Sequence, residues 1–239
     1  MAITFVVAAN AKNEDTANLS VTKPSGIQSG DVIVANLCSV QGATITNPTS
    51  FTTVLTQNAS TGVMMRVAYK IATGSEPSSY TWQTSTSSQT LASSLLVFRG
   101  VAGSGTVRTS NSDGVAATSN ATPSLTGVQS TDMVVLLGGA RPESSSATND
   151  TTAPGSPWTA PAAAHSGAGS GNFSSSTDAA YQINGTTGTF TTDVSSGIAA
   201  AGLALVADAG ASAPAGTATP STTANTPKSS IGAKAQVIG

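Results

Sequence analysis

The sequence predicts an all-β protein: a β-sandwich of jelly-roll type, built from two sequence-related halves and followed by an extended C-terminal arm. Three observations predict this class. A polar turn followed by an apolar run occurs twice, short β-branched segments are separated by turns rich in Gly, Pro and Ser, and helical periodicity is nearly absent. The 239 residues are enough for one large β domain with a buried core.

The repeated turn lies at residues 26–34 and again 101 positions later at residues 127–135, with the sequences GIQSGDVIV and GVQSTDMVV. Each copy places an aspartate, Asp31 or Asp132, between a polar turn and an apolar run. This pattern is typical of a surface loop that enters a buried strand, with the Asp capping the turn through side-chain to backbone hydrogen bonds. A spacing of this size indicates a duplicated half-domain rather than a solenoid.

The first half divides into short apolar runs that end at turns. Polar residues 10–15 separate the first two runs, a Pro turn at residues 46–50 precedes Phe51, and a hairpin loop is expected at residues 58–62. Arg99 stands before Gly100 at the end of the last run, where it is expected to pair with an Asp or a carbonyl. The expected strands are residues 2–9, 17–22, 31–40, 51–57, 63–71, a strand beginning at 80–82, and 92–99.

The second half shows the same blocks in the same order. A Pro turn again ends on a large aromatic residue, Trp158, and the Ala-rich segment 196–205 is assigned to a strand because Gly197 and Gly202 would each cost a helix ~1 kcal/mol. We therefore expect repeats at about 20–101 and 122–208 within a sandwich of residues 1–208. The blocks that match residues 31–37, 47–52, 68–71, 81–82 and 95–98 are residues 132–137, 154–159, 180–183, 189–191 and 203–206.

Two arrangements of these halves are open. In the preferred one, strands from both copies interleave into two packed sheets of a single sandwich, which leaves fewer exposed edges. The alternative is two tandem sandwiches of roughly 100 residues each. Contacts between the strands at residues 32–37 and 134–137, within one sheet or core, favour the first.

Residues 209–239 lack any periodic pattern and consist mainly of Ala, Ser, Thr, Pro and Gly. Such a composition buries too little apolar surface to offset its ordering entropy, so we expect this arm to lie against a partner chain. Its apolar residues near the end, Ile231, Val237 and Ile238, are the expected assembly contacts.

Composition narrows the range of partners. Charged residues make up only 8% of the chain, against about 25% in an average domain. The net charge of −2 gives no attraction to nucleic acid or to an anionic membrane, and no apolar run approaches the ~20 residues of a membrane span. The first nine residues lack a basic region, so we expect a first strand there and synthesis in a cytoplasm without a signal peptide.

The sequence predicts no catalytic, cofactor or metal site. The single histidine, His165, lies in a loop of small residues, and no Gly-x-Ser-x-Gly elbow accompanies it. Asp31 and Asp132 would suit glycoside hydrolysis as a carboxylate pair, but turn capping explains both. Residues 111–114 and 149–150 do not fill a calcium loop, and the lone Cys38 is expected to be a buried apolar residue.

The aromatic residues allow two interpretations. Trp82 and Trp158 are candidates for stacking on a sugar ring. However, Phe51 matches Trp158 in the repeat, and Tyr69 matches Tyr181, which is what packing of a duplicated core would give. Packing is the preferred interpretation.

Four segments resemble a family of β-rich proteins encoded by tailed bacteriophages, often described as minor tail or virion structural proteins. They are residues 24–34, 69–77 (YKIATGSEP), 80–82 and 98–101. The resemblance extends over about residues 20–208 and implies a virion component with a β-sandwich body and no active site. The second half lacks the Arg-Gly ending of the first, and the arm falls outside the match.

We therefore expect a non-enzymatic virion surface protein, either a capsid decoration or minor capsid protein or a minor tail protein. Its expected partners are major capsid or tail proteins and further copies of itself, held by the arm and by sandwich contacts through avidity. The alternative is a carbohydrate-binding adhesin for glycans of the host cell surface. A hydrolase that depends on Asp31 or Asp132 is a third hypothesis, with little support from the residues.

Overall fold

The computed structural model describes residues 1–209 apart from 41, 60–61, 86–88, 143–149 and 165–174. The described chain is all-β, as predicted, and among its residues no helix is long and apolar enough to cross a membrane. Its only helical element is a short 3₁₀ turn, η1 (Ala162–Ala164). The strands are β1 (Thr4–Thr16), β2 (Asn18–Thr22), β3 (Val32–Val40), β4 (Ile45–Thr46), β5 (Thr52–Asn58), β6 (Val63–Ile71), β7 (Ser79–Thr84), β8 (Gln89–Arg99), β9 (Val107–Ala121), β10 (Met133–Pro142), β11 (Thr151–Thr152), β12 (Ser176–Ile183) and β13 (Thr189–Leu205).

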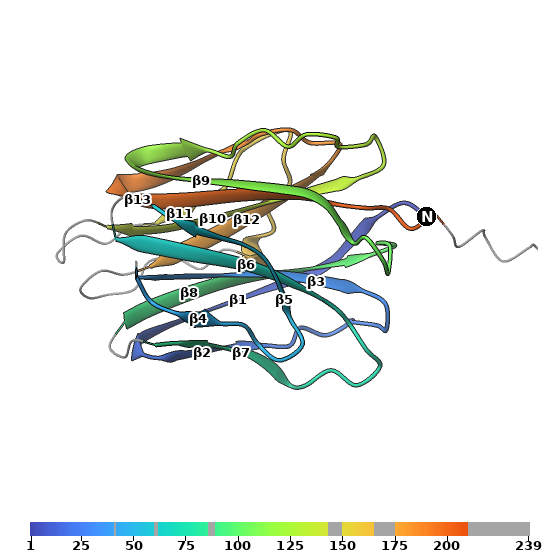
Figure 1. Cartoon of the computed structure of the whole chain (residues 1–239), viewed down its shortest axis with the longest axis horizontal. Helices are drawn as coiled ribbons and strands as arrows, with labels where there is room; N and C mark the ends of the chain where they lie inside the picture. Colours follow the sequence, from blue (N-terminus) through green and yellow to red (C-terminus); the bar gives the residue numbers. More distant parts are fainter. Residues whose placement is uncertain (41, 60–61, 86–88, 143–149, 165–174, 210–239) are drawn as a thin grey trace, which may run out of the picture.

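The strands form three antiparallel layers (Figure 1). The middle layer has the order β1-β8-β3-β6-β5. One of its faces is covered by the sheet that contains β9, β13, β10 and β12, with β11 also paired to β13. The other face is covered by the small sheet β2-β7-β4, at the bottom of Figure 1. The molecule is therefore a β-sandwich with a further small sheet on one side.

Strand β3 is buried along nearly its whole length because both of its faces are covered, and most of its residues are apolar. Val32 and Val34 point into the main core, between the two large sheets, while Ile33 and Leu37 point into the core under the small sheet. On β10 the same alternation recurs: Val135 and its same-face neighbours Met133 and Leu137 face the main core, and Val134 and Leu136 face the opposite side. Residues from both halves of the chain thus meet in one core.

The two large sheets have the same strand order at four positions, β1-β8-β3-β6 in one and β9-β13-β10-β12 in the other. The expectation that strands of the two halves interleave within a sheet is wrong. Each large sheet of the described chain takes its strands from one half, although most of the paired strands, such as β1 with β8 and β9 with β13, are not consecutive in the sequence. The jelly-roll topology stays a prediction.

Two local predictions are also wrong, and one strand was not predicted. Residues 10–15, expected to be a turn, continue strand β1, because β8 pairs with them. Residues 107–121, to which no strand was assigned, form β9 along β13. Residues 189–191, expected to match a separate strand at 81–82, begin the long strand β13, which has an irregular register between Thr191 and Ser196.

Side-chain contacts close both sides of the sandwich. On one side Phe5 of β1 stacks on Tyr181 of β12, with ring centroids 4.8 Å apart, and Phe98 of β8 meets Tyr181 edge-on at 5.6 Å. On the other side the Ser112 hydroxyl of β9 donates to Gln57 Oε1 of β5 at 2.8 Å. These contacts tie the edge strands of one sheet to those of the other.

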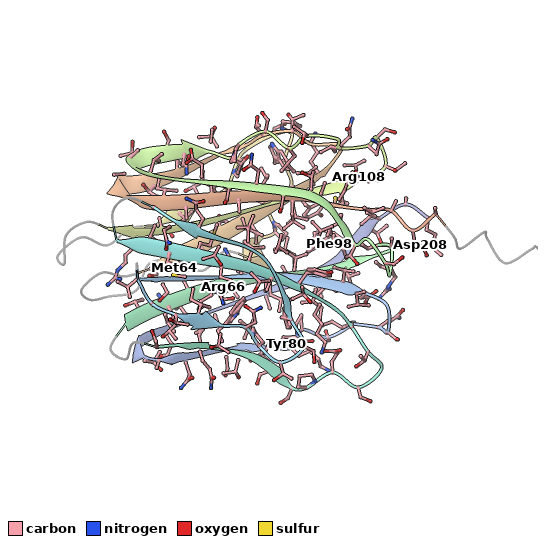
Figure 2. All side chains as sticks on the ribbon, viewed as in Figure 1. Met64, Arg66, Tyr80, Phe98, Arg108 and Asp208 are labelled. Carbon is pink, nitrogen blue, oxygen red and sulfur yellow. The ribbon has the colours of Figure 1, made fainter. Side chains whose placement is uncertain are left out.

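The body ends beside its own beginning (Figures 1 and 2). The Asp208 amide donates to the carbonyl of Gly100 at 2.9 Å, and the ammonium group of Met1 donates to the Asp208 carbonyl at 2.6 Å. A β-bridge between Val101 and Ala207 lies next to these bonds. The last described residues are therefore fixed at one end of the sandwich.

Candidate functional site

The Asp31 carboxylate lies at the start of β3 and is almost completely buried. It accepts a hydrogen bond from the Gln28 amide at 2.8 Å, which closes the polar turn as predicted. Arg99, at the end of β8, donates to both carboxylate oxygens at 2.8 Å through Nε and Nη2, and Nη2 also donates to the Gly26 carbonyl at 3.1 Å. The predicted pairing of Arg99 with an Asp or a carbonyl is confirmed for both acceptors.

Asp132 is held by the same geometry from a different strand. Its carboxylate accepts from the Gln129 amide at 2.9 Å, and Arg108 donates to it through Nε at 2.6 Å and Nη2 at 3.1 Å. Arg108 belongs to β9, the edge strand that was not predicted, and is labelled in Figure 2. The second half therefore lacks an Arg at the end of β13, and its Arg comes instead from β9, the edge strand that pairs with β13.

These two Asp–Arg clamps, Asp31 with Arg99 and Asp132 with Arg108, explain the carboxylates structurally. In each clamp the hydrogen bond to the Asp carboxylate raises the pKa of the arginine above its ordinary value. Each aspartate has its own guanidinium and its own backbone donor, so turn capping and ion pairing account for both carboxylates. The clamps fasten the repeated turns to the strands beside them.

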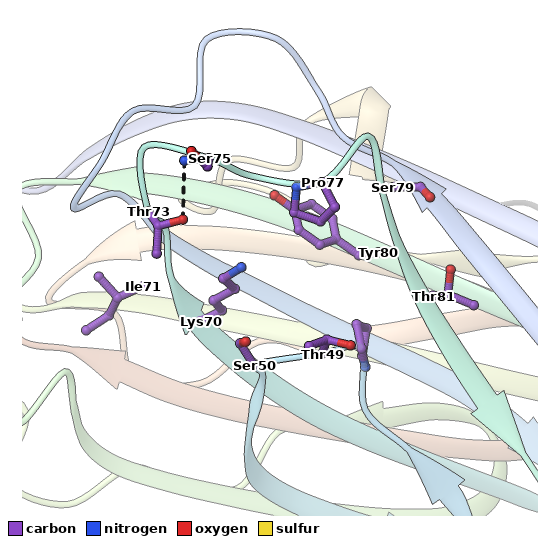
Figure 3. A pocket seen from close by; sticks show the side chains of 11 residues that line it. Thr49, Ser50, Lys70, Ile71, Thr73, Ser75, Pro77, Ser79, Tyr80 and Thr81 are labelled. Carbon is purple, nitrogen blue, oxygen red and sulfur yellow. Dashed lines mark hydrogen bonds between the residues drawn. The ribbon is translucent and has the colours of Figure 1, made fainter.

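A hollow of about 560 Å³ opens between the turn at residues 48–50 and the turn that joins β6 to β7 (Figure 3). Hydroxyl side chains dominate its lining, and no sequence argument nominated it as a site. No local pattern indicates the hollow, because its lining comes from turns that are separated in the sequence. Its lining residues are Pro48, Thr49, Ser50, Lys70, Ile71, Thr73, Ser75, Pro77, Ser79, Tyr80 and Thr81.

Lys70 lies at the floor of this hollow and forms an ion pair with Glu76, with Nζ 2.7 Å from Oε2. Both side chains are nearly buried, with 9% and 3% of their surface exposed. The Glu76 carboxylate also accepts from the Thr73 amide at 2.7 Å, the Thr73 hydroxyl at 3.1 Å and the Tyr80 hydroxyl at 3.1 Å. The charges at the floor are therefore balanced, and the carboxylate is fully occupied.

The ionisation of this cluster follows from these contacts. Burial alone would raise the pKa of Glu76, but the hydrogen bonds from Lys70, Thr73 and Tyr80 outweigh it, so the pKa lies below its ordinary value. Burial and the adjacent carboxylate raise the pKa of Tyr80 above its ordinary value. Glu76 is therefore charged and Tyr80 neutral at pH 7, and neither is poised to exchange protons there.

Ser50 forms one lip of the hollow in a left-handed backbone conformation, with φ at 67°. It occupies the third position of a β-turn closed by a hydrogen bond from the Phe51 amide to the Pro48 carbonyl, 3.1 Å long. That position of a type II turn favours Gly, because a side chain there is strained. The chain nevertheless places a hydroxyl residue at this point.

The two tryptophans are not equivalent. Trp82 is 0% exposed and packs under the small sheet with Phe51 and Tyr80, so its role as a sugar-stacking residue is ruled out: a buried indole has no face for a ligand. Trp158 is half-buried, donates from Nε1 to the Thr187 carbonyl at 3.2 Å, and packs closely over Gly185. Its packing against the outer face of β10 accounts for its position.

The thiol of Cys38 is buried in the main core and lies 3.8 Å from the Ala140 carbonyl. Burial raises its pKa to about 12, so the thiol is neutral and unreactive at pH 7. The expectation of a buried apolar cysteine is confirmed.

The remaining candidates lie outside the described residues or have structural neighbours. His165 and the arm residues Ile231, Val237 and Ile238 are outside them. Asp113, expected in a turn, lies in β9, where its carboxylate accepts from the Gly114 amide at 2.7 Å. Across the described part of the chain, no three His, Cys, Asp or Glu side chains gather as a metal ion would require.

Comparisons of the chain with protein-family models, with curated proteins and with solved structures gave no match.

Proposed function

We propose that this chain is a non-enzymatic structural protein of a bacteriophage particle, displayed on its surface as a capsid decoration, minor capsid or minor tail protein. The body is the sandwich of residues 1–208, which we take as one folding unit that arose by duplication. The segment at residues 209–239 is the attachment arm, with Ile231, Val237 and Ile238 as its apolar contacts.

The observation that carries the proposal is the place where the body ends. Asp208 is hydrogen-bonded to Gly100 and to the ammonium group of Met1, so the arm departs from a fixed point at one end of a rigid sandwich. A sandwich that is attached through one end exposes its opposite end to the solvent. This orientation suits display on the surface of a particle.

Charge supports contact between an arm and a neighbouring body. All acidic residues lie at or before Asp208, whereas the only charged residues of the arm are Lys228 and Lys234. A weakly basic arm and an acidic body attract one another between copies. Each single contact is weak, and the many copies on a symmetric particle together give a high overall avidity.

The Asp–Arg clamps support the non-enzymatic part of the proposal. The two aspartates of the repeated turn, Asp31 and Asp132, both accept hydrogen bonds from an arginine and from a backbone amide. The turns that they fasten lead into the buried strands β3 and β10, so these residues serve the stability of the fold.

The experiment asks whether the protein is part of a particle. Particles released from cells that carry the gene are purified on a density gradient and probed with an antibody against the sandwich. We expect the full chain to sediment with the particles and a chain lacking residues 209–239 to remain in the free fraction. A full chain found only in the free fraction would overturn the particle role, and equal incorporation of both chains would overturn the role of the arm.

A further inference from the structure

We propose that the hydroxyl-lined hollow between the turn at residues 48–50 and the β6–β7 turn binds a neutral sugar ring. The hollow is separate from the two tryptophans, and the sequence did not indicate it as a site. Sugar binding at this hollow does not depend on the particle role, because the sandwich body alone contains the site.

The size and shape of the hollow suit a small ligand. Its volume of about 560 Å³ lies within the range of roughly 300–1,000 Å³ that is typical of small-molecule sites. Figure 3 shows Thr49 and Ser50 on one side and Pro77 and Tyr80 on the other, with Lys70 between them. Two separate loops therefore face the same space.

The lining offers hydrogen bonds that the protein itself does not use. Among the described residues, no partner is found for the hydroxyl groups of Thr49, Ser50, Ser75 and Ser79. A hydroxyl group both donates and accepts, and so it matches the hydroxyl groups of a sugar in either direction. The rings of Pro48 and Pro77 add apolar contact for the C–H faces of the same ligand.

The balance of charge selects a neutral ligand. Lys70 is the one positive group of the lining, and its ammonium lies 2.7 Å from the Glu76 carboxylate. An anionic ligand that approached Lys70 would meet this carboxylate, and a cationic ligand would meet the ammonium group. Either charged ligand is disfavoured relative to a neutral one of the same shape.

The conformation of Ser50 is an independent indication. A non-glycine residue in the left-handed region is strained, and such residues concentrate at binding sites. Glycine at this position would relieve the strain but remove a hydroxyl group from the lip of the hollow.

The test is a titration of the full chain with methyl glycosides of glucose, galactose, mannose and N-acetylglucosamine, followed by amide chemical shifts in NMR. We expect millimolar binding of at least one glycoside, with shifts confined to the amides of residues 49–50 and of residues 70–81 other than Pro77. Thr49→Trp fills the hollow from an exposed position and should weaken binding by at least about tenfold. Ser104→Trp, at an exposed loop residue outside the lining, is the matched control and should bind like the natural chain.

Charge selectivity gives a second, independent readout. Glucuronate should bind more weakly than the methyl glucoside to the natural chain, and Glu76→Gln should raise its affinity several-fold because Lys70 then lacks its counter-charge. The proposal is overturned if no glycoside shifts these amides, if Thr49→Trp and Ser104→Trp bind equally well, or if the natural chain prefers glucuronate.

Discussion

At the residue scale, buried polar side chains hold the layers together. Asn36 of β3 is fully buried: its Oδ1 accepts from the Ser94 amide at 2.8 Å, and its Nδ2 donates to the Gly138 carbonyl of the facing sheet at 3.4 Å. The Ser94 hydroxyl continues this contact by donating to Thr177 of the facing sheet at 2.9 Å. A polar connection thus crosses the main core between the two large sheets.

Replacing Asn36 by Ala should destabilise the protein. The buried Ser94 amide would lose its acceptor, which costs about 1–3 kcal/mol in the free energy of unfolding. Urea denaturation followed by tryptophan fluorescence measures the change. Ser104→Ala, at an exposed loop position, serves as the control and should stay within about 0.5 kcal/mol of the natural chain; an equal effect of both variants would contradict the role of Asn36.

The lowered pKa of Glu76 should make the stability of the fold depend on pH in acid. Its folded-state pKa is lowered, so its contribution is fully present above the ordinary carboxyl pKa of about 4.3 and is lost as the pH falls through the lower folded value. The natural chain should therefore lose stability in acid below about pH 4.3 more steeply than Glu76→Gln, which has no such carboxyl group. Thermal melts from pH 7 to pH 2 compare the two; parallel curves would contradict this assignment.

Residue types and spacing predicted the clamps only in part. The turn-capping role of Asp31 and its pairing with Arg99 followed from a polar turn before an apolar run and from an Arg at a strand end. Arg108 did not follow, because no local pattern indicates which neighbouring strand will supply a guanidinium. The hollow was missed for a similar reason: its hydroxyl residues come from two turns that only the folded chain brings together.

At the element scale, the central strands were predictable and the edge strands were not. β3 and β10 are largely apolar because both of their faces are covered, and this pattern is readable in the sequence. β9 is polar along much of its length, since an edge strand exposes its residues, and its strand conformation comes from pairing with β13. The polar end of β1 is ordered in the same way by β8.

The two glycines in β10 adapt this strand to its neighbours. A Cβ on Gly138 would lie 2.4 Å from the ring of Phe190, and one on Gly139 would lie 3.0 Å from Cβ of Cys38. Phe190 is fully buried and belongs to β13, which makes this contact part of the packing of the second sheet. The strand therefore needs glycine at this point despite its low strand propensity.

Gly138→Ala should destabilise the fold by about 1–3 kcal/mol, because the new methyl group overlaps the ring of Phe190. Gly103→Ala is a matched control, since a Cβ there meets no atom within 4 Å. Urea denaturation measures both variants. If Gly138→Ala were as stable as Gly103→Ala, the packing of Phe190 described above would be wrong.

At the scale of the whole molecule, the halves depend on one another for burial. The main core takes side chains from β3, β6 and β8 in one half and from β10, β12 and β13 in the other. Separation of the halves would expose this apolar surface on both, and large exposed apolar faces cause aggregation. The sequence indicated two related halves, but the way in which their sheets face each other depends on packing between distant residues.

Fragments 1–101 and 102–209 expressed separately should therefore fail to fold, while the two expressed together should associate. Dispersion of amide resonances in NMR spectra distinguishes these states. A well-dispersed spectrum from one fragment alone would show that this half folds independently. Such a result would favour the arrangement of two tandem sandwiches.

The burial of Cys38 has a practical consequence. The chain contains one cysteine, and its thiol is shielded in the main core with a pKa of about 12. A maleimide reagent at neutral pH should therefore leave the folded natural chain unlabelled. A cysteine introduced at Ser104 would then be the sole target for a gold cluster or a fluorophore, so that electron microscopy or energy transfer can report where the protein sits and which way it faces.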